Sequence, residues 1–360
     1  MNGQGKLLTH FLKNADKLVI PVYQRNYDWK EEHCKKLYSD LVKTVREGKR
    51  WHFFGGIVSV SDPMGSSSDY LVIDGQQRIT TVSLLLLAIA NLVKAGIVMP
   101  KDRNLYDVIT KKYLVDEINP KQRKMKLKPI KGDQDSYDRL WCDPSEYNQS
   151  SRITQNYLYF YNQIQQDDIS VDQLFSAVEK LQIIDITLTP PDDDPQLVFE
   201  SLNSTGLDLN EGDKIRNFVL MRRSMEEQEQ FYDDYWSPIE KNAGYDKQTN
   251  SYDVSPFIRD YLGIKERRLT AMKEIYQEFK DYVEKRGQIE DVLKELRDYA
   301  KRYNKIRSGS SEFPLRLRAS LYRLNRFESS VCRPFLMEVF RLQEEDLLSL
   351  DTVAEVCRIV

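Results

Sequence analysis

The sequence predicts an α+β protein in which a small mixed sheet with helices is followed by an all-helical region. Three observations support this fold class. Short runs of β-branched and aromatic residues, typical of strands, occur at residues 53–59 and 70–73 and again at 181–189. From about Met225 onward, apolar residues recur at three- and four-residue spacing, as in amphipathic helices. Hydrophobic residues make up 41% and charged residues 30% of the 360-residue chain, which is typical of folded globular proteins.

The order of these patterns predicts two domains. We expect residues 1–222 to form the mixed domain, with a mostly helical insertion at about 100–180, and residues 223–360 to form a helical domain. The run at 181–189 is expected to rejoin the first sheet. The other expected elements of the first domain, in chain order, are a short helix at 7–12, a strand at 18–20, a helix at 31–45, strands at 53–59 and 70–73, a helix that starts near Gln76, and helices at 196–202 and 214–221.

The most informative segment is VIDGQQRITTV, residues 72–82, which leads from an apolar strand through a polar turn into an apolar helix. Asp74-Gly75 is a turn dipeptide, and the polar residues after it occupy the expected first helical turn. A helix start offers unpaired N–H groups to an anion, and Arg78 adds a positive charge beside them. This arrangement favours a phosphate-binding site, although the same letters are also typical of an ordinary capped turn.

A second polar segment, IPVYQRNYDW, spans residues 20–29. Because Pro21 favours an extended backbone, Tyr23 and Arg25 are expected to share a face, where an aromatic plane beside a guanidinium suits a nucleotide base or a phosphate. The alternative is a structural network that ties Arg25 to an acid such as Asp74. Trp29 is expected to anchor the next helix.

A third polar segment, FESLNSTGLDLNEGDKIRN, covers residues 199–217. Gly206 is expected to take a positive φ, and Asn203 ahead of it suits either a bound phosphate or ribose or a helix cap. Arg216 lies in the next helix, three residues after Asp213. Arg216 therefore suits either a ligand contact or a surface ion pair of small energetic worth.

Taken together and in this order, these segments resemble the N-terminal domain of GmrSD-type modification-dependent restriction proteins, including phosphorothioate-sensing relatives. The resemblance rests on YQR, FFGGIV, IDGQQR and FESLNSTG with its following IRN, and it covers roughly residues 7–222. It implies a ParB/sulfiredoxin-like fold for residues 1–222. It does not imply the sulfiredoxin-type catalytic cysteine, because no cysteine lies in or next to these segments.

The resemblance further implies that the domain binds and hydrolyses a nucleoside triphosphate (GTP, CTP or UTP) together with Mg²⁺. The residues make this reasonable, since phosphoryl transfer depends chiefly on positioning and charge neutralisation. We assign catalytic roles to Asp74, which would hold Mg²⁺ or water, to Gln77, which would orient the nucleophile, and to Arg78, which would neutralise phosphate charge. The residues expected to contact the nucleotide are Gly75, Gln76, Thr80, Thr81, Asn203 and Arg216.

Modified double-stranded DNA and an HNH-type nuclease domain or subunit are the partners that the resemblance implies. The expected sensing pocket is built around Pro21, Tyr23, Gln24 and Arg25. Two other hypotheses remain open: a ParB-like module that binds DNA or nucleotide without hydrolysis, and a purely structural turn that braces the sheet. Self-association into a homo-oligomer also remains open.

Motifs and bulk charge exclude several other functions. A GxxxxGK[ST] motif is absent from the sequence, which excludes a Walker-type NTPase. The three histidines lie in the N-terminal region outside any HNH-like context, so we assign no nuclease centre to this chain.

The formal net charge is −3, so DNA binding would need a local basic face. Two candidate clusters exist, each also compatible with a solvated surface: lysines and arginines at 111–131, and the arginines at 316–341.

The cellular location is expected to be the cytoplasm. The longest apolar run, residues 82–93, is too short to span a bilayer, and the N-terminus lacks a secretory apolar core. The four scattered cysteines form no CxxC pair, which favours a reduced protein without a zinc site.

Because the sequence stops within an amphipathic helix, we expect Val360 to mark a truncation or a domain boundary.

Overall fold

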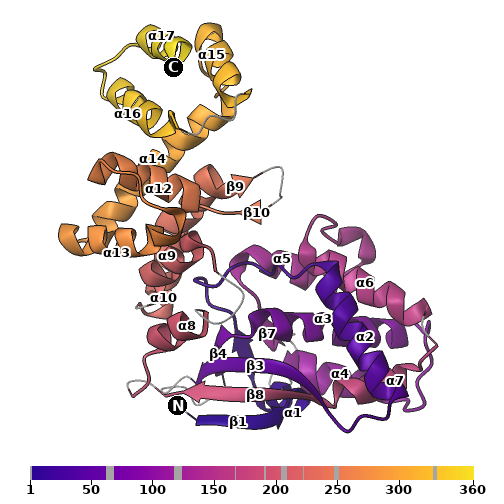
Figure 1. The fold of residues 1–360 in the computed structure, drawn as a ribbon. Coiled ribbons are helices and arrows are strands. Elements are labelled where there is room, and N and C mark those ends of the chain that lie inside the picture. The colour runs from indigo at the N-terminus through magenta and orange to yellow at the C-terminus, as the bar shows by residue number, and fades with distance from the viewer. Residues whose placement is uncertain are drawn as a thin grey trace. The chain divides into compact units, whose positions relative to one another are not determined.

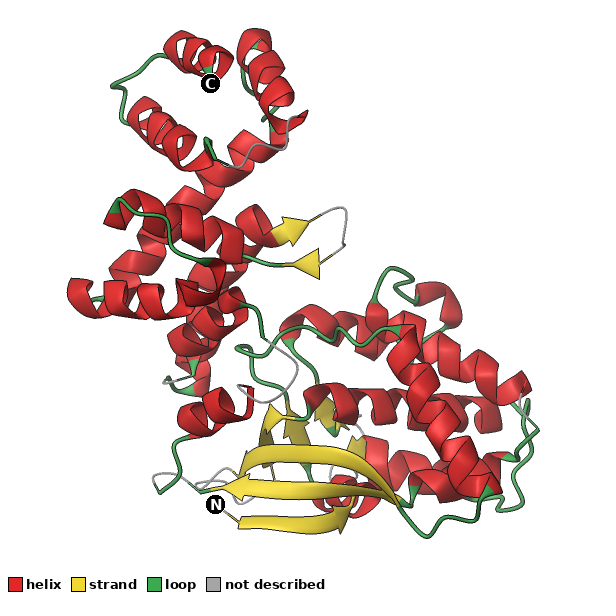
Figure 2. Ribbon diagram, in the orientation of Figure 1, coloured by secondary structure: helices red, strands yellow, loops and turns green. Residues whose placement is uncertain are grey.

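The structure is a computed structural model, and it describes residues 2–61, 69–116, 124–166, 168–189, 192–203, 209–221, 223–246, 251–326 and 331–360. The chain forms two compact units, Met1–Leu202 and Asn203–Val360. The first unit contains a mixed sheet and helices, and the second is helical apart from one short hairpin (Figure 1, Figure 2). The predicted α+β fold class is therefore confirmed.

A six-stranded sheet organises the first unit, with the strand order β1-β8-β3-β4-β2-β7. Strand β8 pairs in parallel with β3 and antiparallel with β1, while β3 and β4 are antiparallel and β2 is parallel to both β4 and β7. The strand bounds are β1 Asn2–Leu7, β2 Lys17–Val19, β3 His52–Ser61, β4 Asp69–Asp74, β7 Leu127–Lys128 and β8 Leu181–Leu188. The run at 181–189 thus rejoins the first sheet, as predicted.

Most helices of the first unit gather at one end of this sheet, whereas α8 lies at the other end, beyond the tip of β8 (Figure 1). They are α1 Leu8–Asn14, α2 Glu31–Arg46, α3 Gln76–Lys94, α4 Leu105–Ile109, α5 Lys131–Arg139, α6 Arg152–Gln166, α7 Val171–Val178 and α8 Pro195–Asn203, with η1 Thr110–Leu114 and η2 Pro144–Glu146 between them. The region at 100–180 is mostly helical, as predicted. It also contributes β7 to the sheet edge and a small β5–β6 ladder, Val115–Asp116 with Lys124–Met125.

Helix α3 forms the centre of the first core. Its residues from Ile79 to Ala90 are all buried, because apolar side chains occupy every face of the helix rather than one stripe. It packs against α4 and α6, among other elements. Among the described residues, α3 alone is long and apolar enough to cross a membrane, yet 78% of its apolar window is buried inside the protein. We therefore interpret α3 as a core helix.

Helices dominate the second unit. Their bounds are α9 Glu211–Leu220, α10 Met225–Phe231, η3 Tyr232–Trp236, α11 Ser237–Ile239, η4 Glu240–Gly244, α12 Ser255–Glu266, η5 Met272–Glu274, α13 Ile275–Arg286, α14 Ile289–Ser308, α15 Leu315–Arg326, α16 Arg333–Glu344 and α17 Leu350–Ile359, with the hairpin β9 Tyr245–Asp246 and β10 Ser251–Tyr252. Helix α9 packs against α12 and α13, so it belongs to the second unit, although the sequence placed the domain boundary after residue 222. Asn210 caps α9 by accepting a bond from the Asp213 N–H at 2.8 Å.

Candidate functional site

Strand β4 ends at Asp74, Gly75 turns the chain, and α3 begins at Gln76, as the sequence predicts. Gly75 has a φ of +95°, which is unfavourable for any residue with a Cβ atom. A Cβ at this position would lie 3.0 Å from Ile57 Cγ1 and 3.1 Å from the Gly56 carbonyl oxygen. Glycine is therefore required here both by the turn and by the close approach of β3.

Arg78 extends from the first turn of α3 across strand β3. Its Nη1 donates to the Gly56 carbonyl at 3.0 Å, and it lies 3.8 Å from Asp74 Oδ2. Gly55, at φ +123°, leaves room for the guanidinium, because a Cβ there would lie 2.6 Å from Arg78 Nε. The Arg78 side chain is 32% exposed and that of Asp74 41%, so this ion pair is open to solvent. Its charges are therefore accessible to a phosphate.

The 20–29 segment folds directly over the start of α3. Gln24 is buried and donates to the Ile73 carbonyl at 2.7 Å, and Gln76 donates to Gln24 Oε1 at 3.2 Å and to the Arg25 carbonyl at 3.1 Å. Two motifs that are about 50 residues apart in sequence therefore form one hydrogen-bonded unit. The network expected as an alternative was to tie Arg25 to an acid such as Asp74, but Gln24 and Gln76 make the connection instead, and Asp74 pairs with Arg78.

The predicted extended conformation of the Tyr23 segment is wrong. The Gln24 N–H donates to the Pro21 carbonyl at 3.0 Å, which closes a turn, and Pro21 is itself buried. Tyr23 is only 2% exposed, and its burial raises the pKa of the hydroxyl, whereas Arg25 remains half-buried. Tyr23 and Arg25 therefore do not form a shared exposed face. The turn was missed because its side-chain anchors are distant in sequence.

Gln77 and Thr81 hold the same segment from inside. Gln77 Oε1 accepts from the N–H groups of Asp28 and Trp29 at 3.0 and 3.1 Å, and its Nε2 donates to the Asn26 carbonyl at 3.4 Å. Thr81 is fully buried, with its hydroxyl 2.7 Å from that of Tyr27. The neighbouring Thr80 is also buried, at 4% exposure. These side chains brace the turn, and the two hydroxyls expected near a nucleotide lie in the core.

The two remaining predicted contacts, Asn203 and Arg216, lie in the second unit. Asn203 is the last residue of α8, and its side chain falls outside the described residues, as do residues 204–208. Arg216 is 3% exposed; its Nη1 donates to Glu240 Oε1 at 3.0 Å, and its guanidinium lies 5.0 Å from the centre of the Tyr232 ring. The structure therefore places Arg216 in a buried ion pair.

The structure also contains a polar pair, Lys6 and Asp185, that the sequence did not predict. Lys6 Nζ lies 2.6 Å from Asp185 Oδ2, and Asp185 is 4% exposed with no hydrogen-bond partner for its Oδ1. Across the sheet, Gly55 is paired with Ile183 and Ile57 with Asp185, so Asp185 shares the face on which Arg78 covers Gly55. The sequence feature that could have indicated this pair is Asp185, a single acid within the apolar run LQIIDITLT.

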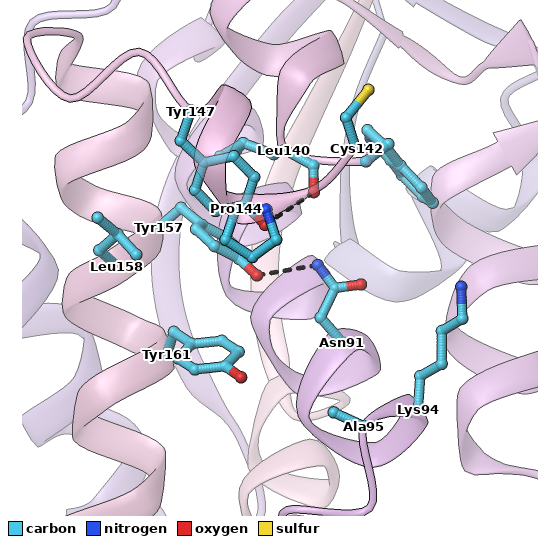
Figure 3. A pocket seen from close by; sticks show the side chains of 11 residues that line it. Asn91, Lys94, Ala95, Leu140, Cys142, Pro144, Tyr147, Tyr157, Leu158 and Tyr161 are labelled. Atoms are coloured by element: carbon cyan, nitrogen blue, oxygen red, sulfur yellow. Dashed lines mark hydrogen bonds between the residues drawn. The ribbon is translucent and has the colours of Figure 1, made fainter.

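A separate cavity of about 410 Å³ lies at the other end of α3 (Figure 3). Its polar centre is Asn91, whose Nδ2 donates to the Tyr157 hydroxyl at 2.9 Å. The cavity is lined by Asn91, Lys94, Ala95, Leu140, Trp141, Cys142, Pro144, Tyr147, Tyr157, Leu158 and Tyr161. Since α3 rises about 1.5 Å per residue, this cavity is roughly 25 Å from the Asp74 turn and forms no part of it.

Metal binding at the turn would depend on Asp74. The described part of the chain contains no group of three or more His, Cys, Asp or Glu side chains that could hold a metal ion by themselves. Mg²⁺ in nucleotide sites commonly takes only one or two protein carboxylates, the other ligands being phosphate oxygens and water. An exposed Asp74 next to Arg78 fits that pattern.

The first unit is thus an α+β module in which the β4–Gly75–α3 turn presents an acid beside an arginine. Gln24, Gln76 and Gln77 hold this turn against the 20–29 segment. The family described as GmrSD restriction endonuclease, N-terminal domain, matches residues 8–220, more than half of the chain. The chain therefore belongs to this family, which places it in a restriction-endonuclease context. A comparison with curated proteins found no match.

Proposed function

We propose that this chain binds and hydrolyses a nucleoside triphosphate at the Asp74–Arg78 turn, and that hydrolysis couples the sensing of modified DNA to a nuclease. The observation that carries the proposal is the open Asp74–Arg78 pair at the N-terminus of α3. There the helix dipole, the first N–H groups and a guanidinium all favour negative charge. Family membership supplies the restriction context.

Each of three solvent-accessible charged residues, Asp74, Arg78 and Arg25, has a role in this proposal. Arg78, positioned by Gly55 and the Gly56 carbonyl, would bind phosphate oxygens. Asp74 would hold Mg²⁺ or a water molecule, and Mg²⁺ would supply further charge neutralisation. Arg25 has its carbonyl bonded to Gln76, and its guanidinium has no partner among the described residues. Arg25 is therefore the member of the 20–29 segment best suited to contact DNA or nucleotide.

A second candidate function is binding without hydrolysis. It is favoured by the position of Gln77, the residue expected to orient the nucleophile. Its side-chain amide is bonded to the backbone of residues 26, 28 and 29. Gln77 would have to release these bonds before it could position a water molecule, so the turn as it stands is better built to bind a nucleotide than to hydrolyse it.

The two functions are separated by measuring nucleotide binding and phosphate release in parallel. Purified wild type and Asp74→Asn are titrated with GTP, CTP, UTP and ATP in Mg²⁺, with plain and with modified duplex DNA. Hydrolysis predicts phosphate release that falls at least tenfold in Asp74→Asn while binding persists. Binding without release in the wild type would establish the alternative, and neither binding nor release would refute both.

Sensing is tested most directly at Arg25. Tyr23 is unsuitable because removing a buried aromatic side chain destabilises the protein by about 3–5 kcal/mol. Arg25→Ala removes a half-buried guanidinium and leaves the carbonyl that accepts from Gln76. We expect this variant to lose the preference for modified over plain DNA. An unchanged preference would place the sensing surface elsewhere.

The proposal includes the partners that the family implies: modified double-stranded DNA and an HNH-type nuclease domain or subunit. It also includes a cytoplasmic location, which agrees with four free cysteines, Cys34, Cys142, Cys332 and Cys357. Size-exclusion chromatography with light scattering, with and without nucleotide, would show whether the chain self-associates.

A further inference from the structure

The outer face of α15 carries three arginines that form no ion pair with any residue that the structure describes. Arg318, Arg323 and Arg326 are exposed, and none has a hydrogen bond or an acidic partner among the residues that the structure describes. At 100° per residue they fall within an arc of about 140° on the helix, and they span about 12 Å along its axis. They therefore form one continuous basic face.

The neighbouring arginines differ from these three. Arg316 lies 2.5 Å from Glu355, Arg302 lies 2.7 Å from Glu344, and Arg341 bonds both Glu338 and Glu345. Arg358 also pairs with Glu355. These four arginines, on α14, α15, α16 and α17, are thus paired with glutamates. Arg318, Arg323 and Arg326 have no such acidic partner in the part of the chain that the structure describes. By contrast, α14 in the same unit carries both acidic and basic side chains along its length.

Two large apolar side chains lie between the arginines on the same face. Tyr322 is 66% exposed and Leu315 is 79% exposed, while the opposite side of α15 is buried through Leu317 and Leu321 and packs near α17. An exposed aromatic ring flanked by guanidinium groups is a common composition of nucleic-acid-binding surfaces.

We propose that the α15 face, Leu315, Arg318, Tyr322, Arg323 and Arg326, binds the phosphate backbone of a DNA duplex. One DNA strand carries a phosphate every 3.4 Å along its axis, so a 12 Å span of arginines meets about three successive phosphates. Planar guanidinium groups bind phosphates bidentately, and Tyr322 packs against sugars or the groove edge. The choice of DNA as partner rests on the restriction context of the proposed function. The surface itself lies outside the family match at residues 8–220.

The test compares two triple variants of the full chain that remove equal charge. Arg318→Gln/Arg323→Gln/Arg326→Gln removes the unpaired arginines, and Arg316→Gln/Arg341→Gln/Arg358→Gln removes paired ones. Affinity for a fluorescent plain duplex is measured by anisotropy at several salt concentrations. We expect the first variant to lose roughly ten- to a hundredfold in affinity and to lower the salt slope by about 3, and the control to change little. Unchanged thermal unfolding of the first variant confirms that it is folded.

Two results would overturn the proposal. One is an equal loss of affinity in both triple variants, which would make the effect one of net charge. The other is tighter binding of a poly-glutamate competitor than of duplex DNA, lost in the first variant, which would identify an acidic protein segment as the occupant. Because the assay contains no nucleotide, its failure is distinguishable from failure of hydrolysis at Asp74.

Discussion

At the residue scale, the side chain of Gln77 connects α3 to the loop that covers its N-terminus. The amide oxygen accepts two backbone N–H groups, those of Asp28 and Trp29, and the amide nitrogen donates to the Asn26 carbonyl. Gln77 is 9% exposed, so water cannot readily replace these bonds. One side chain therefore fixes the position of a four-residue segment relative to the candidate site.

We predict that Gln77→Ala destabilises the protein by about 2 kcal/mol, because two backbone N–H groups lose their acceptor. The same change should make the 20–29 segment susceptible to proteolysis before the rest of the first unit. Chemical denaturation and limited proteolysis measure the two effects. Gln165→Ala, on an exposed part of α6, is the matched control and should be neutral. Equal stability of wild type and Gln77→Ala would show that the loop is held by other contacts.

At the element scale, the edge strand β1 is attached to the sheet by more than its backbone ladder. β1 contains Gly3 and Gly5, which provide little side-chain packing, and Lys6 extends to the buried Asp185 on β8. A buried carboxylate is costly unless it is paired, so Lys6 compensates a charge that the fold has placed in the core. β1 and β8 therefore depend on each other.

A double-mutant cycle tests this dependence. Lys6→Met leaves Asp185 buried without its partner, and we expect the free energy of unfolding to fall by about 2 kcal/mol. This loss is smaller than that for breaking a fully buried ion pair, because the Lys6 side chain is 38% exposed. Adding Asp185→Leu removes the uncompensated charge and should recover most of that stability. Free energies of unfolding from urea denaturation provide the comparison. If the double variant were as unstable as the sum of its two single variants, the ion pair would not couple the strands.

Most elements could be predicted because their signals are local. The apolar run after Gln76 predicts α3, and the alternating run at 181–189 predicts β8, with bounds that agree to within about two residues. The conformation of Pro21–Gln24 depends instead on bonds to Ile73 and Gln76, which no local pattern records. Similarly, the sequence identified Arg216 as a candidate, but its partner Glu240 was visible only in three dimensions.

At the scale of the whole molecule, charge is distributed differently in the two units. The first unit exposes an acid–arginine pair at the start of α3, whereas many arginines of the second unit are paired with acids. Among the described residues, Arg318, Arg323 and Arg326 on α15 are exceptions. A net charge of −3 conceals both features. Local geometry, rather than composition, therefore determines where an anion or a DNA backbone can bind.

The second unit also contains a buried acid that should make its stability depend on pH. Asp260 is 2% exposed on α12, and burial raises its pKa to about 6, against the opposing effect of Arg259 and Arg333. Between about pH 4 and pH 6 the folded state keeps a proton that the unfolded state releases. The contribution of Asp260 to stability therefore falls as pH rises through this window. Above it, the ionised group costs on the order of 3 kcal/mol.

We predict that Asp260→Asn raises the unfolding temperature of the second unit at pH 7 and has little effect near pH 4, where Asp260 is already neutral in the folded protein. Differential scanning calorimetry at several pH values gives the difference between variant and wild type, which cancels the titration of all other groups. Asp281→Asn, an exposed acid on α13, serves as the control and should show no such pH-dependent difference. A stabilisation that was equal at both pH values would mean that packing of the amide, and not loss of the buried charge, was responsible. A destabilisation at pH 7 would mean that the carboxylate is held in place by Arg259 and Arg333 more strongly than burial opposes it.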